Sequence, residues 1–223
     1  MSYNIAIDGP AGAGKSTIAK IVSKKLGFIY VDTGAMYRAM AVYFLDKKID
    51  CNDETAVSSA CDDVNIMINY TDGVQQVILN GENITSRLRT EEVGNTASKT
   101  AVYPAVRKKL VEIQQNIAKS TDVVMDGRDI GTCVLPDAVC KIYLTASVLT
   151  RAKRRALELQ QKGENPDIEV IKKDIEDRDY RDMNRKESPL CKAKDAEIVD
   201  SSEMDIDMVV DTIINIFNRK AGK

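Results

Sequence analysis

The sequence has no histidine, and its cysteines form no recognisable pattern. Without histidine the chain cannot build a Ser-His or Cys-His nucleophile or a histidine-ligated metal site. The five cysteines are odd in number and far apart, and no Cys-x-x-Cys pair occurs, which argues against a zinc site and against a disulfide framework. We therefore expect free thiols in a reducing compartment.

Long apolar runs and an excess of one charge are also missing. The longest apolar run, residues 39–45, is too short to cross a bilayer. The N-terminus has no basic segment followed by an apolar one, so we expect no signal peptide. A net charge of −2 provides no overall basic field for nucleic acid or an anionic membrane. A cytoplasmic protein that binds neither is the expectation.

Strand-like and helix-like segments alternate along the chain. We predict strands at 3–7, 28–31, 122–126, 138–144 and 197–200. We predict helices at 15–26, 35–47, 90–118 with a break before Pro104, 147–162, from 167 onward, and 205–219. The alternation favours a parallel sheet with right-handed crossovers. Between them, Asp72-Gly73 and Asn80-Gly81 are hairpin signals, so residues 62–86 are predicted to form a small inserted antiparallel sheet.

The stretch DGPAGAGKST at residues 8–17 contains the pattern GxxxxGK[ST] between a predicted strand and a predicted helix. Glycines allow the loop to turn its N–H groups inward and let phosphate approach the backbone. The helix that follows presents its N-terminal N–H groups to the same phosphates. Lys15 can then reach the outer phosphates, and the Ser16 hydroxyl can bind Mg²⁺.

The motif alone leaves several classes open, including a chance match in a turn rich in glycine and alanine. A true P-loop could belong to a GTPase, a motor-type ATPase or a small-molecule kinase. A GTPase should carry an Asn-Lys-x-Asp base reader, and the nearest stretch, CKAKD at 191–195, lacks the asparagine. The remainder of the chain must therefore identify the acceptor.

Two further segments follow predicted strands, where ligands bind in open parallel sheets. In DTGAMYR, residues 32–38, Thr33 can cap the next helix, and Arg38 could hold a second phosphate or be an ordinary surface arginine. In DGRDIGT, residues 126–132, Asp126 could assist Mg²⁺, or the acid and glycine could simply build a turn.

Arginines are concentrated between residues 151 and 185, at Arg151, Arg154, Arg155, Arg178, Arg181 and Arg185. The spacing of the last three predicts one helix face, beside a stripe formed by Ile168, Ile171 and Ile175. Such a run is usually a solvated face paired with neighbouring acids. Beside a P-loop it becomes a candidate lid, because phosphoryl transfer needs positioning and positive charge more than acid–base groups.

Several of these stretches together resemble the bacterial-type cytidylate kinases, within the nucleoside monophosphate kinase family. The matching segments are IDGPAGAGKST, DTGAMYR, RTEEVGNTAS, VYPAVR, DGRDIGT and RDYRDMNRKESPL, between residues 7 and 190. The resemblance implies a P-loop three-layer α/β fold with a central parallel five-stranded sheet, an inserted antiparallel sheet and a helical lid. It implies a core of 1–34, 100–150 and 190–223, an acceptor region of 35–99 and a lid of 151–189.

The resemblance also implies the roles of individual residues. The ATP-binding set is Gly9, Pro10, Ala11, Gly12, Ala13, Gly14, Lys15, Ser16 and Thr17, with Arg154 and Arg155 on the ATP side of the lid. The CMP-binding set is Thr33, Arg38, Ser98, Arg107, Arg128, Asp129, Arg178, Asp182 and Arg185. Among these, Lys15, Arg128, Arg178 and Arg185 would be catalytic. Ser16, or else Thr17, would bind Mg²⁺ directly, and Asp126 would do so through water.

The implied base reader agrees with the chemistry of cytosine. The Asp129 carboxylate can accept a hydrogen bond from the N4 amino group. Arg107 and Ser98 can donate to N3 and O2, whereas uracil presents the opposite polarity at O4 and N3. The expected reaction is in-line phosphorylation of CMP or dCMP by MgATP, in a monomer. The alternatives are a kinase for another small acceptor, such as shikimate, and a nucleotide-dependent binding module.

Overall fold

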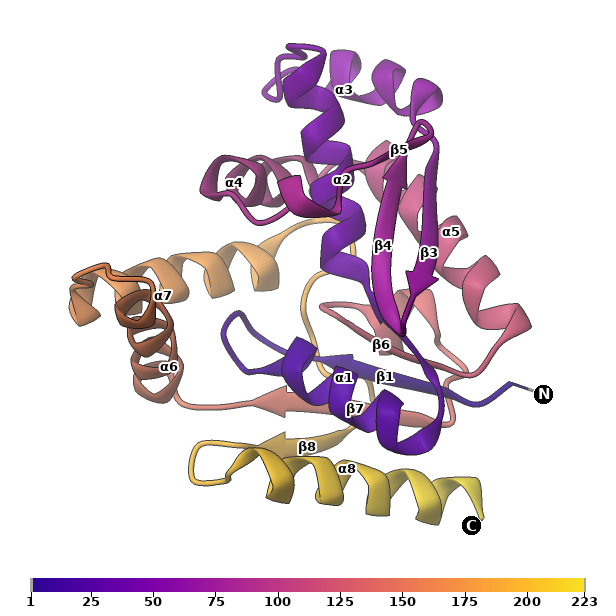
Figure 1. Ribbon diagram of the computed structural model, residues 1–223, viewed down its shortest axis with the longest axis vertical. Coiled ribbons are helices and arrows are strands. Elements are labelled where there is room, and N and C mark those ends of the chain that lie inside the picture. Colours follow the sequence, from indigo (N-terminus) through magenta and orange to yellow (C-terminus); the bar gives the residue numbers. More distant parts are fainter. Residues whose placement is uncertain (1, 223) are drawn as a thin grey trace. The chain divides into compact units, whose positions relative to one another are not determined.

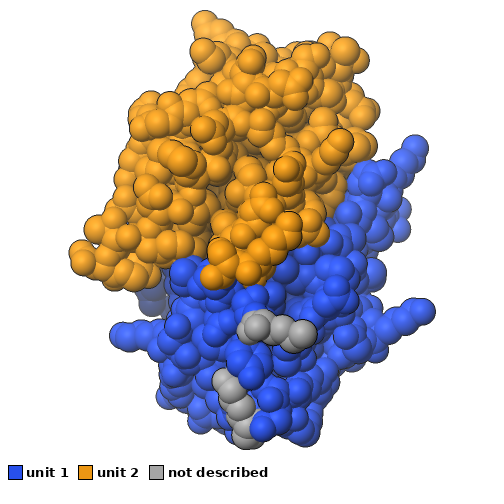
Figure 2. All heavy atoms as spheres, turned by 90° about the vertical axis from the view of Figure 1, so that its right-hand side faces the viewer, with its two compact units in different colours: residues 1–30, 121–223 blue, residues 31–120 orange. Residues whose placement is uncertain are grey.

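The computed structural model describes residues 2–222, which form two compact units (Figure 2). Unit 1 comprises the residues up to 30 and from 121 onward, and unit 2 comprises residues 31–120. Between residues 2 and 222, no helix combines the length and the apolar character needed to cross a membrane. The two units are described in turn.

A five-stranded parallel sheet forms the core of unit 1 (Figure 1), although residues 31 and 32 at the end of its edge strand β2 are assigned to unit 2. Its strand order is β2-β6-β1-β7-β8. The bounds are β1 Asn4–Asp8, β2 Ile29–Asp32, β6 Val123–Gly127, β7 Cys140–Thr145 and β8 Glu197–Asp200. The central strand, β1, pairs with β6 on one side and β7 on the other. The α/β fold and the parallel sheet predicted from the sequence are confirmed.

Two helices pack together against this sheet, α1 (Lys15–Leu26) and α8 (Ile206–Ala221). Alternate residues of β1, Ile5 and Ile7, are fully buried in one cluster with side chains of both helices, including Val22 and Phe217. The helical spacing of apolar residues in α1 therefore reflects this packing. Gly27 directly follows α1, has a φ of 71° and caps the helix in the left-handed conformation.

Helices α6 (Val148–Gln161) and α7 (Ile168–Asn184) are consecutive in the chain and pack against each other in unit 1. Ala152 and Ala156 of α6 pack against Ile171 and Ile175 of α7, so the predicted isoleucine stripe is a helix–helix contact. Helix α7 ends at Asn184, and Arg185 is extended, with φ −65° and ψ 144°. The prediction that Arg178, Arg181 and Arg185 share one helical face is therefore wrong for Arg185.

Unit 2 is mostly helical. Its helices are α2 (Thr33–Asp46), α3 (Glu54–Ala60), α4 (Glu91–Thr100) and α5 (Pro104–Ser120), with short 3₁₀ turns at Cys61–Asp63 and Thr85–Arg87. The expected break before Pro104 separates α4 from α5. The side chain of Asp32 caps α2 by accepting from the Ala35 N–H at 2.9 Å, so the prediction that Thr33 caps this helix is wrong. Helix α3, capped by Asp53, was not predicted.

The inserted sheet of unit 2 has the strands β3 (Ile66–Thr71), β4 (Val74–Leu79) and β5 (Glu82–Asn83), all antiparallel. Both predicted turns have two successive residues with positive φ, 52° and 75° at Asp72-Gly73 and 48° and 89° at Asn80-Gly81. Type I′ hairpin turns require this conformation, which Asn, Asp and Gly adopt most readily. The predicted antiparallel insert is confirmed.

Candidate functional site

The P-loop of unit 1 connects the end of β1 to α1 and runs against the backbone of β7. Gly9 has a φ of +152°, and a Cβ atom there would lie 1.9 Å from the Leu144 carbonyl oxygen, so only glycine fits. Gly14, at φ 86°, precedes the first residue of α1, Lys15. The Lys15 ammonium group is buried and donates to the Pro10 carbonyl oxygen at 2.7 Å. The loop therefore holds its own cation in a defined place.

The environment of Lys15 contains charges of both signs. Burial lowers its pKa well below the ordinary lysine value, and the positive charges of Arg128 and Arg178 lower it further. The carboxylates of Asp126 and Asp182 act in the opposite direction. The five side chains come from α1, from the segment that ends β6 and from α7. The structure thus places Lys15, the predicted ATP-binding lysine, close enough to Arg128 and to the lid residues Arg178 and Asp182 for their charges to act on it.

Asp126 at the end of β6 accepts two hydrogen bonds from side chains of unit 1. Its Oδ2 accepts from the Ser16 hydroxyl at 2.8 Å, and its Oδ1 accepts from the Tyr30 hydroxyl at 2.8 Å. A hydroxyl beside a carboxylate provides the oxygen ligands that Mg²⁺ prefers. The donor set of Ser16 and Asp126 therefore fits Mg²⁺, and Tyr30, which the sequence did not single out, fixes the carboxylate.

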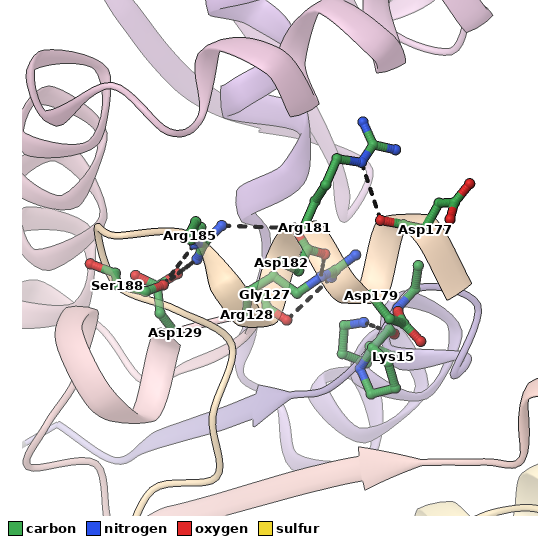
Figure 3. Close-up of polar contacts among 12 residues, drawn as sticks. Lys15, Gly127, Arg128, Asp129, Asp177, Asp179, Arg181, Asp182, Arg185 and Ser188 are labelled. Atoms are coloured by element: carbon green, nitrogen blue, oxygen red, sulfur yellow. Dashed lines mark hydrogen bonds and ion pairs between the residues drawn. The ribbon is translucent and has the colours of Figure 1, made fainter. Parts of the chain in front are cut away.

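The predicted acceptor-side residues of unit 1 are paired with one another (Figure 3). Arg128 donates to Asp182 of α7 at 2.7 Å. Arg185 lies 3.4 Å from Asp129, and both side chains are only 6% exposed. Burial raises the pKa of Asp182, but Arg128, Arg178 and Arg185 outweigh it, so the pKa lies below its usual value. Segments that are distant in sequence thus meet in one group of ion pairs, the paired cluster, which consists of Arg128, Asp129, Asp182 and Arg185.

Asp8, the last residue of β1, supports the segment that carries Arg128 and Asp129. Its two carboxylate oxygens accept from the backbone N–H groups of Ile130 at 2.8 Å and Gly131 at 2.7 Å. These groups begin a π-helical turn, Ile130–Val134, a kind of turn found frequently at functional sites. Burial raises the pKa of Asp8 to about 6, although the two hydrogen bonds oppose the shift. Asp8 therefore holds the turn that follows the predicted site residues Arg128 and Asp129, and its own pKa lies at about 6.

This shift predicts how stability changes with pH. Between about pH 4 and pH 6, Asp8 binds more protons in the folded chain than in the unfolded chain, so its contribution to stability falls as the pH rises. The fall should be about 3 kcal/mol, from the shift of 3.8 to about 6. Asp8→Asn removes this titration. Urea unfolding should therefore show a larger stability advantage of the original chain at pH 4.5 than at pH 7.

The matched control for that experiment is Asp195→Asn. A hydrogen bond from Lys141 holds the pKa of Asp195 below its usual value, so this carboxylate stays ionised throughout the range. The stability difference caused by Asp195→Asn should be the same at pH 4.5 and pH 7. An equally constant difference for Asp8→Asn would contradict the assignment.

The remaining predicted acceptor residues lie in unit 2. Thr33 is buried in the first turn of α2, Arg38 follows one turn later, and Ser98 is half-buried in α4. Arg107 of α5 is buried, donates to the Ala101 carbonyl oxygen at 3.3 Å and lies 5.6 Å from the centre of the Tyr37 ring. Helix α2 packs against both α4 and α5, which places these side chains on neighbouring elements of one unit.

Three of the predicted lid arginines lie outside the paired cluster. Arg154 donates to the carbonyl and hydroxyl oxygens of Ser201, after β8, and Arg155 forms an exposed ion pair with Glu158. Arg181 is exposed on α7 and donates to the Asp177 carbonyl oxygen (Figure 3). The involvement of Arg154 and Arg155 in ATP binding stays a prediction.

Asp8, Tyr30 and Asp179 were missed, and Arg151 was noticed only as part of a charged run. A signal existed for Asp8, since it ends a buried strand directly before the P-loop, just as Asp126 lies one residue before the end of another buried strand. Tyr30 and Asp179 gave none, because their partners, Asp126 and the P-loop backbone, are distant in sequence.

Comparison with known proteins identifies the family to which this chain belongs. A family model described as cytidylate kinase matches residues 5–219. A cytidylate kinase of Lactobacillus gasseri is 48% identical over 97% of this chain and 94% of its own length. One of Caldicellulosiruptor saccharolyticus is 47% identical over 98% and 97%, respectively. The solved gluconokinase of Sinorhizobium meliloti has a TM-score of 0.50 at 12% identity over 99% of this chain and 94% of its own, a likeness of fold. The chain therefore belongs to the cytidylate kinase family, and it is an enzyme of the kinase class.

Proposed function

We propose that the protein transfers the γ-phosphoryl group of ATP to CMP and to dCMP, giving ADP and CDP or dCDP. The observation that carries this proposal is the buried group around Lys15 in unit 1. There a P-loop lysine shares one charge environment with Arg128, Arg178 and Asp182. A donor loop beside several arginines suits phosphoryl transfer, which depends on positioning and on positive charge around the transferred group.

On the donor side, the backbone N–H groups of the P-loop and the N-terminus of α1 bind the ATP phosphates. Lys15 donates to the β- and γ-phosphate oxygens. Ser16, with Thr17 as the alternative, would hold Mg²⁺ directly and Asp126 would hold it through water; when bound, Mg²⁺ would neutralise charge on the phosphates. Asp126 is already hydrogen-bonded to Ser16, which supports its role beside the metal.

On the acceptor side, Arg38 and Arg128 bind the phosphate of CMP, and Thr33 contributes a hydroxyl. Ser98, Arg107 and Asp129 bind the cytosine base. Arg178 and Arg185 stabilise the negative charge on the transferred group, and Asp182 orients Arg128 by accepting from it. The acceptor phosphate oxygen attacks in line with the leaving ADP oxygen, with no covalent enzyme intermediate. Closure over the nucleotides excludes water and suppresses hydrolysis of ATP.

The test is ADP release coupled to an optical assay, with CMP, dCMP, UMP, AMP and shikimate as acceptors. CMP and dCMP are expected to stimulate ADP release well above the rate with ATP alone. UMP should stimulate less, because the O4 and N3–H of uracil present the wrong hydrogen-bonding groups to Asp129 and Arg107. AMP should stimulate less because adenine has no counterpart of the cytosine O2 and is a larger, two-ring base. Shikimate, which has no cytosine, should give only the background rate. The proposal fails if CMP gives no stimulation.

A further inference from the structure

One residue of the P-loop, Ala11, has both of its backbone polar groups bound by side chains of the α6–α7 pair. The Ala11 N–H donates to Oδ1 of Asp179 in α7 at 3.1 Å. The Ala11 carbonyl oxygen accepts from Nη1 of Arg151 in α6 at 2.8 Å. The two side chains also bind each other, Nη1 of Arg151 to Oδ2 of Asp179 at 2.6 Å. Three elements distant in sequence therefore meet at one loop residue.

The Arg151–Asp179 pair is buried and its hydrogen-bonding groups are engaged on several sides. The two side chains are 5% and 11% exposed. Arg151 also donates through Nε to the Ala146 carbonyl oxygen at 3.0 Å, which anchors the guanidinium group at the start of α6. Buried ion pairs are weak contributors to stability, since desolvation offsets their attraction. What this pair provides beyond an apolar contact is a fixed geometry for the loop backbone.

A single peptide group connects the Arg151–Asp179 pair to Lys15. The Ala11 N–H and the Pro10 carbonyl oxygen belong to the same planar peptide unit. Asp179 accepts from its N–H, and Lys15 Nζ donates to its oxygen at 2.7 Å. Rotation of this peptide would break both bonds together. A carboxylate on the N–H side also polarises the peptide and strengthens its oxygen as an acceptor.

The same helix connects the loop to the paired cluster. In α7, Asp179 directly follows Arg178, and Asp182, which binds Arg128, lies one turn further on (Figure 3). The apolar packing of α6 against α7 holds α7 itself, so Arg178 and Asp182 stay in place when the polar pair is removed. The Arg151–Asp179 pair therefore fixes the P-loop, and with it Lys15, relative to the charged side chains of α7.

We propose that Arg151 and Asp179 are positioning residues for phosphoryl transfer, which hold the Pro10–Ala11 peptide and through it Lys15. This inference rests on the proposed function in taking ATP as the donor. Neither residue needs to touch a nucleotide for this role. Their effect on the reaction is carried by the loop backbone, so it should disappear when Lys15 is absent.

The test is a double-mutant cycle on turnover. Arg151→Met with Asp179→Leu removes both charges together, so that no unpaired buried charge remains to unfold the chain. We expect kcat to fall by roughly 10- to 100-fold, the size expected for misplacement of a catalytic group. The KM for CMP should change little, because the acceptor contacts are untouched. Added to Lys15→Met, the double change should lower kcat little further, whereas a merely structural role predicts independent, additive losses.

A matched control is Lys141→Met with Asp195→Asn, which removes another ion pair of unit 1 with a buried cation. The Lys141 ammonium group binds the Pro136 carbonyl oxygen and Asp195, away from the P-loop backbone, so its removal should leave kcat within about threefold. Thermal unfolding followed by circular dichroism shows whether the variants fold. Asp179→Asn, which keeps an acceptor for the Ala11 N–H but loses the charge, should fall between the original chain and the double variant.

A second readout separates this inference from the proposed function. Fluorescent ATP analogues report donor binding without any acceptor. If CMP gave no turnover, the proposed function would fail, but the cycle could still be measured as ATP affinity. Loss of affinity in the double variant, absent in the Lys15→Met background, would support the positioning role. Additive losses in either readout, or no effect of the double variant on both, would overturn it.

Discussion

Replacement of Lys15 by methionine is expected to lower turnover roughly 10²- to 10³-fold while the chain stays folded, the loss seen when one preorganised electrostatic group is removed. The ammonium group is buried, and burial lowers its pKa well below the usual lysine value. Methionine fills a similar volume without a charge to desolvate, so folding should be preserved. Turnover with saturating ATP and CMP, together with thermal unfolding, measures both expectations.

The control for Lys15→Met is Lys24→Met, which removes an exposed lysine from the same helix. It should leave turnover within about threefold, because an exposed charge at the far end of α1 has no phosphate to bind. If Lys15→Met also retained turnover within that range, the P-loop assignment would be wrong. Loss of ATP affinity without loss of turnover at saturation would instead limit Lys15 to ground-state binding.

The fold was largely predictable because its signals are local. Strands that are buried on both faces appear in the sequence as short continuous apolar segments. The residue types of Asp72-Gly73 and Asn80-Gly81 are enough to predict hairpin turns at these positions. The misses have local causes too. Helix α3 is only seven residues long and has little apolar periodicity, and at the start of α2 two adjacent residues, Asp32 and Thr33, can both cap.

The site was less predictable, because its geometry depends on contacts across the sequence. Motif matching selects residues that contact ligands, and it selected Lys15, Arg128 and Asp182, which the structure places in one charge environment. It does not select residues whose partners are backbone atoms. Asp179 looks like any acid in a charged helix, and its role becomes visible only when the Ala11 N–H, 168 residues away in sequence, lies against it.

Replacement of Asp129 by asparagine is expected to reduce the preference for CMP over UMP by roughly 10²-fold. Sites built to pair with one set of polar groups reject the opposite set strongly, and that rejection is lost when the paired group changes. The carboxylate accepts only, which suits the N4 amino group of cytosine. The amide introduced by Asp129→Asn can also donate, so it would pair with the O4 of uracil. The ratio of kcat/KM for the two nucleotides is the measurement.

The ion pair between Asp129 and Arg185 decides which control is needed. The two side chains are 3.4 Å apart and almost fully buried, so Asp129→Asn also weakens the hold on an arginine assigned to the phosphates. Asp182→Asn removes another carboxylate near the same arginine, since Arg185 lies 3.9 Å from it. That change should lower kcat/KM for CMP and UMP alike. Only Asp129→Asn should alter their ratio, and equal losses for both nucleotides would show that Asp129 orients arginine without reading the base.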